Sequence, residues 1–166
     1  MNIVSIYPYP FDEQLRHDHN VTIIRKNKIF SSEDSKLKGY KTDEASNFPV
    51  RSLFLGFKEL NLTPNKIDFW IFPTPKKKMN MELCKKFFVE FLKCTKNSEI
   101  KSFVSNRVIF IKHHDAHIYT AFYSSPFYNA DILSIDAGGD HGDSRRMLWG
   151  KINKKKFRKL GETFNK

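Results

Sequence analysis

Cysteine, long apolar runs and acidic side chains are all scarce in this sequence of 166 residues. Cys84 and Cys94 fall in one predicted helix, where about 15 Å of rise separates them, so a disulfide within that helix is excluded. We expect both thiols to be reduced. No apolar run approaches the roughly 18–20 residues of a membrane-spanning helix. The N-terminus lacks the basic head and apolar stretch of a secretory signal, so we expect a soluble cytoplasmic protein with no membrane partner.

The charge is strongly positive, with 29 Lys and Arg against 18 Asp and Glu and a formal net charge of +11. Most of the excess is lysine and it is scattered along the chain, as at 76–78, 85–86 and 154–156. Scattered lysine is typical of a solvated surface, so a nucleic-acid partner is not expected. Hydrophobic residues make up 40% of the chain and aromatic residues 14%, which suffices for a packed core.

Apolar patterning along the chain predicts alternating strands and helices. Lys26 and Asn27 predict a tight hairpin turn, because Asn tolerates a positive φ. The polar stretch 31–46 lacks periodicity and is predicted to be a loop. The predicted strands cover residues 2–7, 21–25, 28–32, 67–72, 107–112, 131–136, 146–152 and 157–163. The predicted helices cover residues 48–60, 81–94 and 115–124.

This order of elements predicts an α/β fold, because strands that alternate with helices require crossover connections. An antiparallel three-stranded start that continues into parallel strands is the order of the ribonuclease H-like fold. We therefore expect residues 1–128 to form one ribonuclease H-like lobe. Residues 129–166 contain strands that echo the opening hairpin, and the family resemblance given below implies that they are the opening strands of a second, incomplete lobe.

The densest group of chemically useful side chains follows the predicted strand 107–112. His113 and His117 are four residues apart, and a helix that begins early places both imidazoles on one face, close enough to share a metal ion. His114 and Asp115 would then point elsewhere and hold a ring nitrogen in the required tautomer. The alternative is a polar helix N-terminus, where the helix dipole favours the negative charge of Asp115.

Two further groups are candidates. Asp136 ends a predicted strand and precedes Gly138, Gly139 and Asp140, so its carboxylate is a candidate metal ligand, and the glycines allow close approach to a phosphate. A plain hairpin turn is the alternative there. His17 precedes the second predicted strand and is a candidate general base, or else an ordinary exposed loop histidine.

Taken together, these segments resemble the O-carbamoyltransferase family, which modifies nodulation factors and antibiotics. The resemblance is most specific in the histidine cluster, in the Ser-Pro-Phe that begins at Ser125 and in the strand end at Asp136. It extends upstream to His17-Asp18 and to Phe48-Pro49.

The resemblance implies an actin-like ATPase fold, related to the proteins that install threonylcarbamoyl on transfer RNA. It also implies an enzyme that converts carbamoyl phosphate and ATP into a carbamoyl adenylate and passes the carbamoyl group to a substrate hydroxyl. By the same resemblance, His113, His117 and Asp136 match the ligands of iron or a similar divalent ion. His17 matches the base toward the small-molecule acceptor.

Family members continue well beyond the length of this chain. No counterpart of their adenylate-forming domain is present, so we expect a fragment, a split-gene product or a subunit completed by a second chain. Two other functions stay open at this point: a metal-dependent phosphohydrolase that uses the same three ligands, and a basic, non-enzymatic binding module.

Overall fold

The computed structural model describes residues 1–7, 20–38, 49–74, 89, 107–136, 145–154 and 156–164. The described chain forms two compact units. One comprises residues 1–72 and 80–110, and the other comprises residues 73–79 and 111–166. The predicted boundary between residues 128 and 129 stays a prediction.

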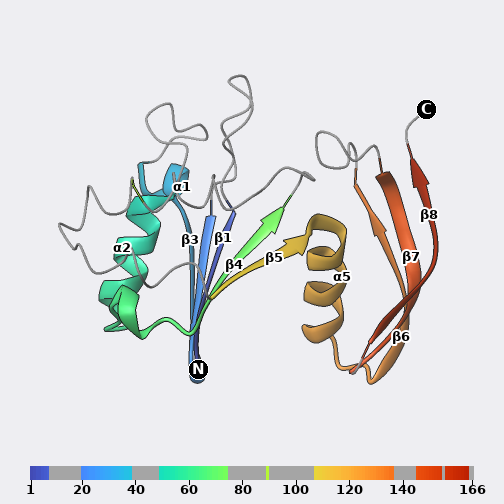
Figure 1. Cartoon of the computed structure of the whole chain (residues 1–166), viewed down its shortest axis with the longest axis horizontal. Helices are drawn as coiled ribbons and strands as arrows, with labels where there is room; N and C mark the ends of the chain where they lie inside the picture. The colour runs from blue at the N-terminus through green and yellow to red at the C-terminus, as the bar shows by residue number, and fades with distance from the viewer. Residues whose placement is uncertain are drawn as a thin grey trace. The chain divides into compact units, whose positions relative to one another are not determined.

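A mixed five-stranded sheet forms the first unit (Figure 1). Its strand order is β3-β2-β1-β4-β5. β1 pairs antiparallel with β2 and parallel with β4, so the predicted α/β, ribonuclease H-like order is confirmed. The strands are β1 (Asn2–Tyr7), β2 (Asn20–Arg25), β3 (Lys28–Glu33), β4 (Phe69–Thr74) and β5 (Val108–Lys112).

The first core lies between this sheet and α2 (Val50–Glu59). Leu53 and Phe57 are four residues apart on the buried side of α2, and the Phe57 ring meets the edge of Trp70 in β4. Phe54, the residue that follows Leu53, is 36% exposed. The completely buried sheet residues are Val4, Ile6, Val21, Ile23, Trp70 and Phe72.

The predicted hairpin turn between β2 and β3 is confirmed, although its positive φ belongs to Lys26, at 52°, and not to Asn27. One local prediction in this unit is wrong. The first part of the predicted loop 31–46 is ordered: β3 continues to Glu33 and is followed by α1 (Asp34–Lys38). The buried Asp34 carboxylate explains this order, because it accepts hydrogen bonds from the backbone N–H groups of Arg51 and Ser52 at the start of α2.

The second unit packs α5 (His113–Tyr123) on a three-stranded antiparallel meander. The meander consists of β6 (Asn129–Ile135), β7 (Arg145–Asn153) and β8 (Phe157–Phe164), in that order. The buried residues of this second core are Ile118, Phe122, Leu148 and Ile152. Among the described residues, no helix is long and apolar enough to cross a membrane.

Candidate metal centre

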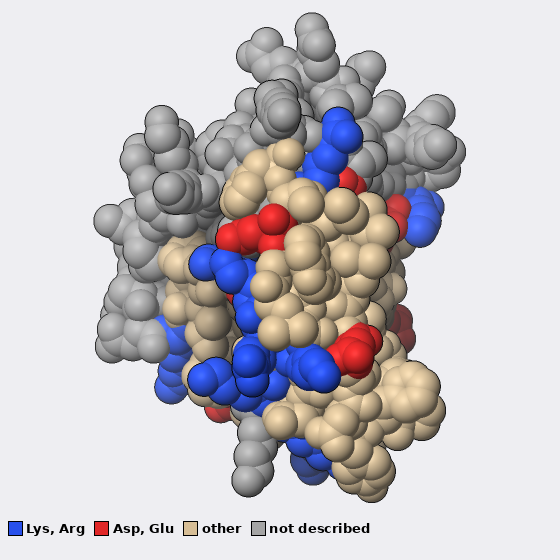
Figure 2. Space-filling model, turned by 90° about the vertical axis from the view of Figure 1, so that its right-hand side faces the viewer, with Lys and Arg blue, Asp and Glu red and all other residues tan. Residues whose placement is uncertain are grey.

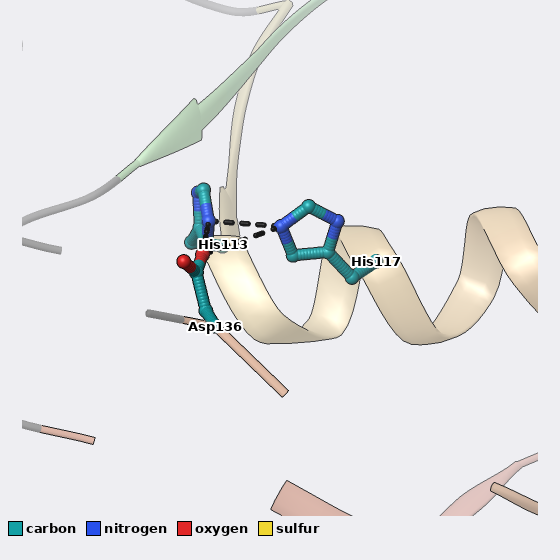
Figure 3. A group of neighbouring side chains, drawn as sticks. All are labelled: His113, His117 and Asp136. Atoms are coloured by element: carbon teal, nitrogen blue, oxygen red, sulfur yellow. Dashed lines mark hydrogen bonds and ion pairs between the residues drawn. The ribbon is translucent and has the colours of Figure 1, made fainter. Parts of the chain in front are cut away.

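His113 and His117 are brought together by the abrupt change from strand to helix after β5. β5 ends at Lys112 and α5 begins at His113, with no connecting residue. The early start that the prediction required is therefore present, and the two imidazoles occupy one face, with ring centroids 4.4 Å apart. Their Nε2 atoms lie 2.9 Å apart (Figure 3).

Asp136 approaches this pair from the strand that packs beneath α5. It follows β6 directly, and its backbone N–H donates to the carbonyl of Arg146, which fixes its backbone beside β7. Its Oδ2 lies 2.7 Å from His113 Nε2 and 3.7 Å from His117 Nε2 (Figure 3). The structure thus brings together the three side chains predicted as metal ligands, although His113 and Asp136 are separated by 23 residues in sequence.

Two of these three distances lie within hydrogen-bonding range, and both end on Nε2 of His113. The Nε2 atom of His113 carries either one hydrogen or one lone pair, yet it lies within 3 Å of both Asp136 Oδ2 and His117 Nε2. A cation placed between three lone pairs accounts for all three separations.

The separations also suit a metal ion in size. A circle through the three ligand atoms has a radius of about 1.9 Å, so an ion about 1 Å out of their plane would lie about 2.1 Å from each of them, the usual distance for imidazole and carboxylate ligands. The residues present therefore fit a divalent transition metal.

The surroundings of His113 favour the uncharged ring that a metal requires. Burial lowers the pKa of His113 below its ordinary 6.5, and the positive charge that His117 can carry lowers it further. The hydrogen bond to Asp136 acts in the opposite direction but does not outweigh burial. His117 is more open, with 55% of its side chain exposed, so the ligand set is accessible to solvent from the His117 side.

A buried hydrogen bond joins the helix to the strand beneath these ligands. His114 is 2% exposed, and its Nδ1 lies 2.9 Å from the hydroxyl of Ser134. His114 neighbours His113 on α5, and Ser134 lies two residues before Asp136, on the α5-facing side of β6. The bond therefore ties together the two segments that supply the ligands. His114 was predicted to orient a ligand directly, and it contacts Ser134 instead. The alternation of buried and exposed residues along the strand before Asp136 could have indicated Ser134 as this partner.

Several predicted site residues lie outside the described part of the chain. His17 is one, and Gly138, Gly139 and Asp140 are the others. The helix predicted over residues 81–94, with both cysteines, also lies outside it apart from Val89. Asp115 is described, and it lies in the first turn of α5, as the helix-dipole interpretation expected.

Comparison with known proteins supports the fold and not the predicted family. No protein-family model matches the chain, and no curated protein matches it. Two solved structures from Pseudomonas aeruginosa are similar: YeaZ, and an uncharacterized protein described as similar to the peptidase YeaZ. Each aligns with a TM-score of 0.52 at 11% identity.

These alignments cover 98% and 99% of this chain and 66% of each neighbour, so the chain spans slightly less than two thirds of their length. Both neighbours have the actin-like ATPase, ribonuclease H-like fold, which is therefore the fold of this chain.

The predicted membership of the O-carbamoyltransferase family is wrong, and with it the predicted carbamoyl transfer and the use of ATP and carbamoyl phosphate. The neighbouring structures are YeaZ and a protein described as similar to it, and neither alternative function gains support from them. The reason lies in the motif: two histidines four apart at a helix start, followed by an aspartate at a strand end, describe a ligand geometry that suits many reactions.

Proposed function

We propose that this protein binds one divalent transition metal ion through His113, His117 and Asp136, and that the ion in turn binds an anionic oxygen of a ligand. The observation that carries the proposal is the convergence of these three ligand atoms within 4.8 Å of one another. Two imidazoles and one carboxylate are the donor set of open, non-haem iron sites, and similar divalent ions accept it as well.

Among the residues that the structure describes, three ligands converge on this centre, and that number favours a working site over a purely structural one. Structural sites usually supply four protein ligands, whereas three leave positions for water or a ligand. When bound, such an ion acts as a Lewis acid toward a phosphoryl or carbonyl oxygen. A hollow of about 240 Å³ adjoins the centre, lined by His117, Ile118, Ala121 and the β6 residues Ile132–Ile135, and offers space for a small ligand.

The test is metal uptake by the full chain after removal of bound ions with EDTA. We expect the protein to take up about one equivalent of Fe²⁺, Mn²⁺ or Co²⁺. His117→Ala should weaken binding at least 100-fold, because it deletes one of three ligands. Asp115→Asn is the matched control, since Asp115 lies on the same helix outside the ligand set, and its affinity should stay within twofold. Full uptake by His117→Ala, or no uptake by the unmodified chain, would contradict the proposal.

A further inference from the structure

A second hollow lies at the opposite end of β6 from the metal centre. Its volume is about 600 Å³, and it is lined by the first residues of β6, the end of β7 and the start of β8 with the residue before it. Three cationic side chains line it, with one carboxylate among them: Lys151, Lys156, Arg158 and Asp131. Two amide side chains, Asn129 and Asn153, complete the polar part of its lining.

Strand pairing explains why these groups face the same space. Asp131 is opposite Lys151, and Lys151 is opposite Arg158. Residues directly opposite each other in antiparallel strands project from the same face, so all three side chains lie on one side of the meander. The turn holds Lys156 beside them, because its backbone N–H donates to the Asn153 side chain at 2.9 Å.

The positive charge of this hollow is only partly neutralised. Lys151 lies 3.7 Å from Asp131, and both side chains are largely exposed. Among the described residues, the side chains of Lys156 and Arg158 have no hydrogen-bond or ion-pair partner. Figure 2 shows Lys and Arg side chains gathered on one part of the face that it views, with few Asp and Glu among them. Cations that line one hollow repel one another, and a bound anion would relieve that repulsion.

We propose that this hollow binds the phosphate groups of a ligand that carries two or three of them. Phosphate suits the site because the planar guanidinium of Arg158 presents a fork of donors to two oxygens, while Lys151 and Lys156 supply point charges. The volume lies within the range for small-molecule sites and exceeds the space that a single phosphate needs. Among the described residues that line the hollow none is aromatic, so the recognition that they supply rests on the phosphates and not on stacking.

The probe is inorganic tripolyphosphate, titrated calorimetrically into the EDTA-treated full chain at low salt. The metal-free protein is necessary because tripolyphosphate also binds divalent ions. We expect saturable 1:1 binding that weakens severalfold between 50 and 200 mM salt, since exposed charges are screened. Arg158→Ala and Lys151→Ala should each weaken it at least fivefold, and His117→Ala should leave it within twofold.

Lys159→Ala is the matched control for overall charge. Lys159 neighbours Arg158 on β8 and pairs with Glu162 outside the hollow, so its loss removes the same formal charge. We expect less than a twofold effect from it. Equal weakening by Lys159→Ala and Arg158→Ala, absence of binding at 10 mM probe, or equal affinity for a tricarboxylate would each overturn the proposal. Because the assay contains no metal, its outcome is independent of the metal-binding proposal.

Discussion

Ser134 makes the contact that we expect to control metal affinity from outside the ligand set. Replacing it with Ala removes the hydroxyl that contacts Nδ1 of the buried His114, which loosens α5 from β6. The loss of one buried hydrogen bond should lower the free energy of unfolding by about 1–3 kcal/mol. Metal affinity should fall by about 10-fold or more, the usual effect of removing a group that supports the ligands.

Urea unfolding of the metal-free chain measures the first effect, and calorimetric titration with Co²⁺ measures the second. Ser134→Thr keeps the hydroxyl and should restore most of both quantities. If Ser134→Ala binds Co²⁺ as tightly as the unmodified chain, the link between this hydrogen bond and the ligands does not exist.

His113 should make stability depend on pH. Its pKa in the folded protein is lower than the 6.5 of the unfolded chain, so the unfolded state binds a proton more readily. Its stabilising contribution is therefore present above pH 6.5 and is lost as the pH falls through the folded pKa. Without metal, the free energy of unfolding should decrease between pH 7.5 and 5.5.

The matched variant is His113→Gln, which removes the titrating ring at that position. It should show a shallower decrease over the same range in urea unfolding experiments. A decrease as steep as that of the unmodified chain would show that burial of His113 is not its cause.

Trp149 and Gly161 show how closely β7 and β8 are packed. The two residues are opposite each other, and a Cβ atom built on Gly161 would lie 2.2 Å from Cζ2 of the indole. Gly161→Ala should therefore push the indole aside and cost about 1–3 kcal/mol of stability. In the double variant Gly161→Ala/Trp149→Ala this loss of stability should largely disappear, because the group that the new Cβ meets is the indole side chain.

Gly150→Ala provides the contrast in the same strand pair. Its Cβ would lie 2.2 Å from the carbonyl oxygen of Arg158, which is backbone and cannot swing away. Trp149→Ala should not rescue this substitution. The measurement is thermal unfolding of Gly161→Ala and Gly150→Ala, each alone and combined with Trp149→Ala. Equal rescue of stability in both combinations would contradict the packing described.

Elements defined by local patterns could be predicted, and those defined by distant contacts could not. The short apolar run that ends before Pro8 predicted the bounds of β1 correctly, and the predicted bounds of β2 and β3 each differ by one residue at one end. The helix that begins at Asp34 was not predicted, because the Asp34 carboxylate is held by backbone N–H groups 17 and 18 residues further along the chain. The start of α5 depended on whether a helix could begin directly after β5, and the residues alone left that open.

In the described part of the chain, three consecutive antiparallel strands occur twice, as β1–β3 and as β6–β8. That order was sufficient to predict the fold, and the structural neighbours confirm it. The family and the activity could not be obtained in the same way. The fold is compatible with many chemistries, and the histidine-aspartate arrangement specifies a metal more sharply than a substrate.

The most direct test of the metal centre is anomalous diffraction from crystals of the full chain loaded with Fe²⁺ or Co²⁺. We expect a single strong anomalous peak about 2.1 Å from His113 Nε2, His117 Nε2 and an Asp136 carboxylate oxygen. An ion found elsewhere, or loaded crystals in which these three side chains contact no ion, would contradict it.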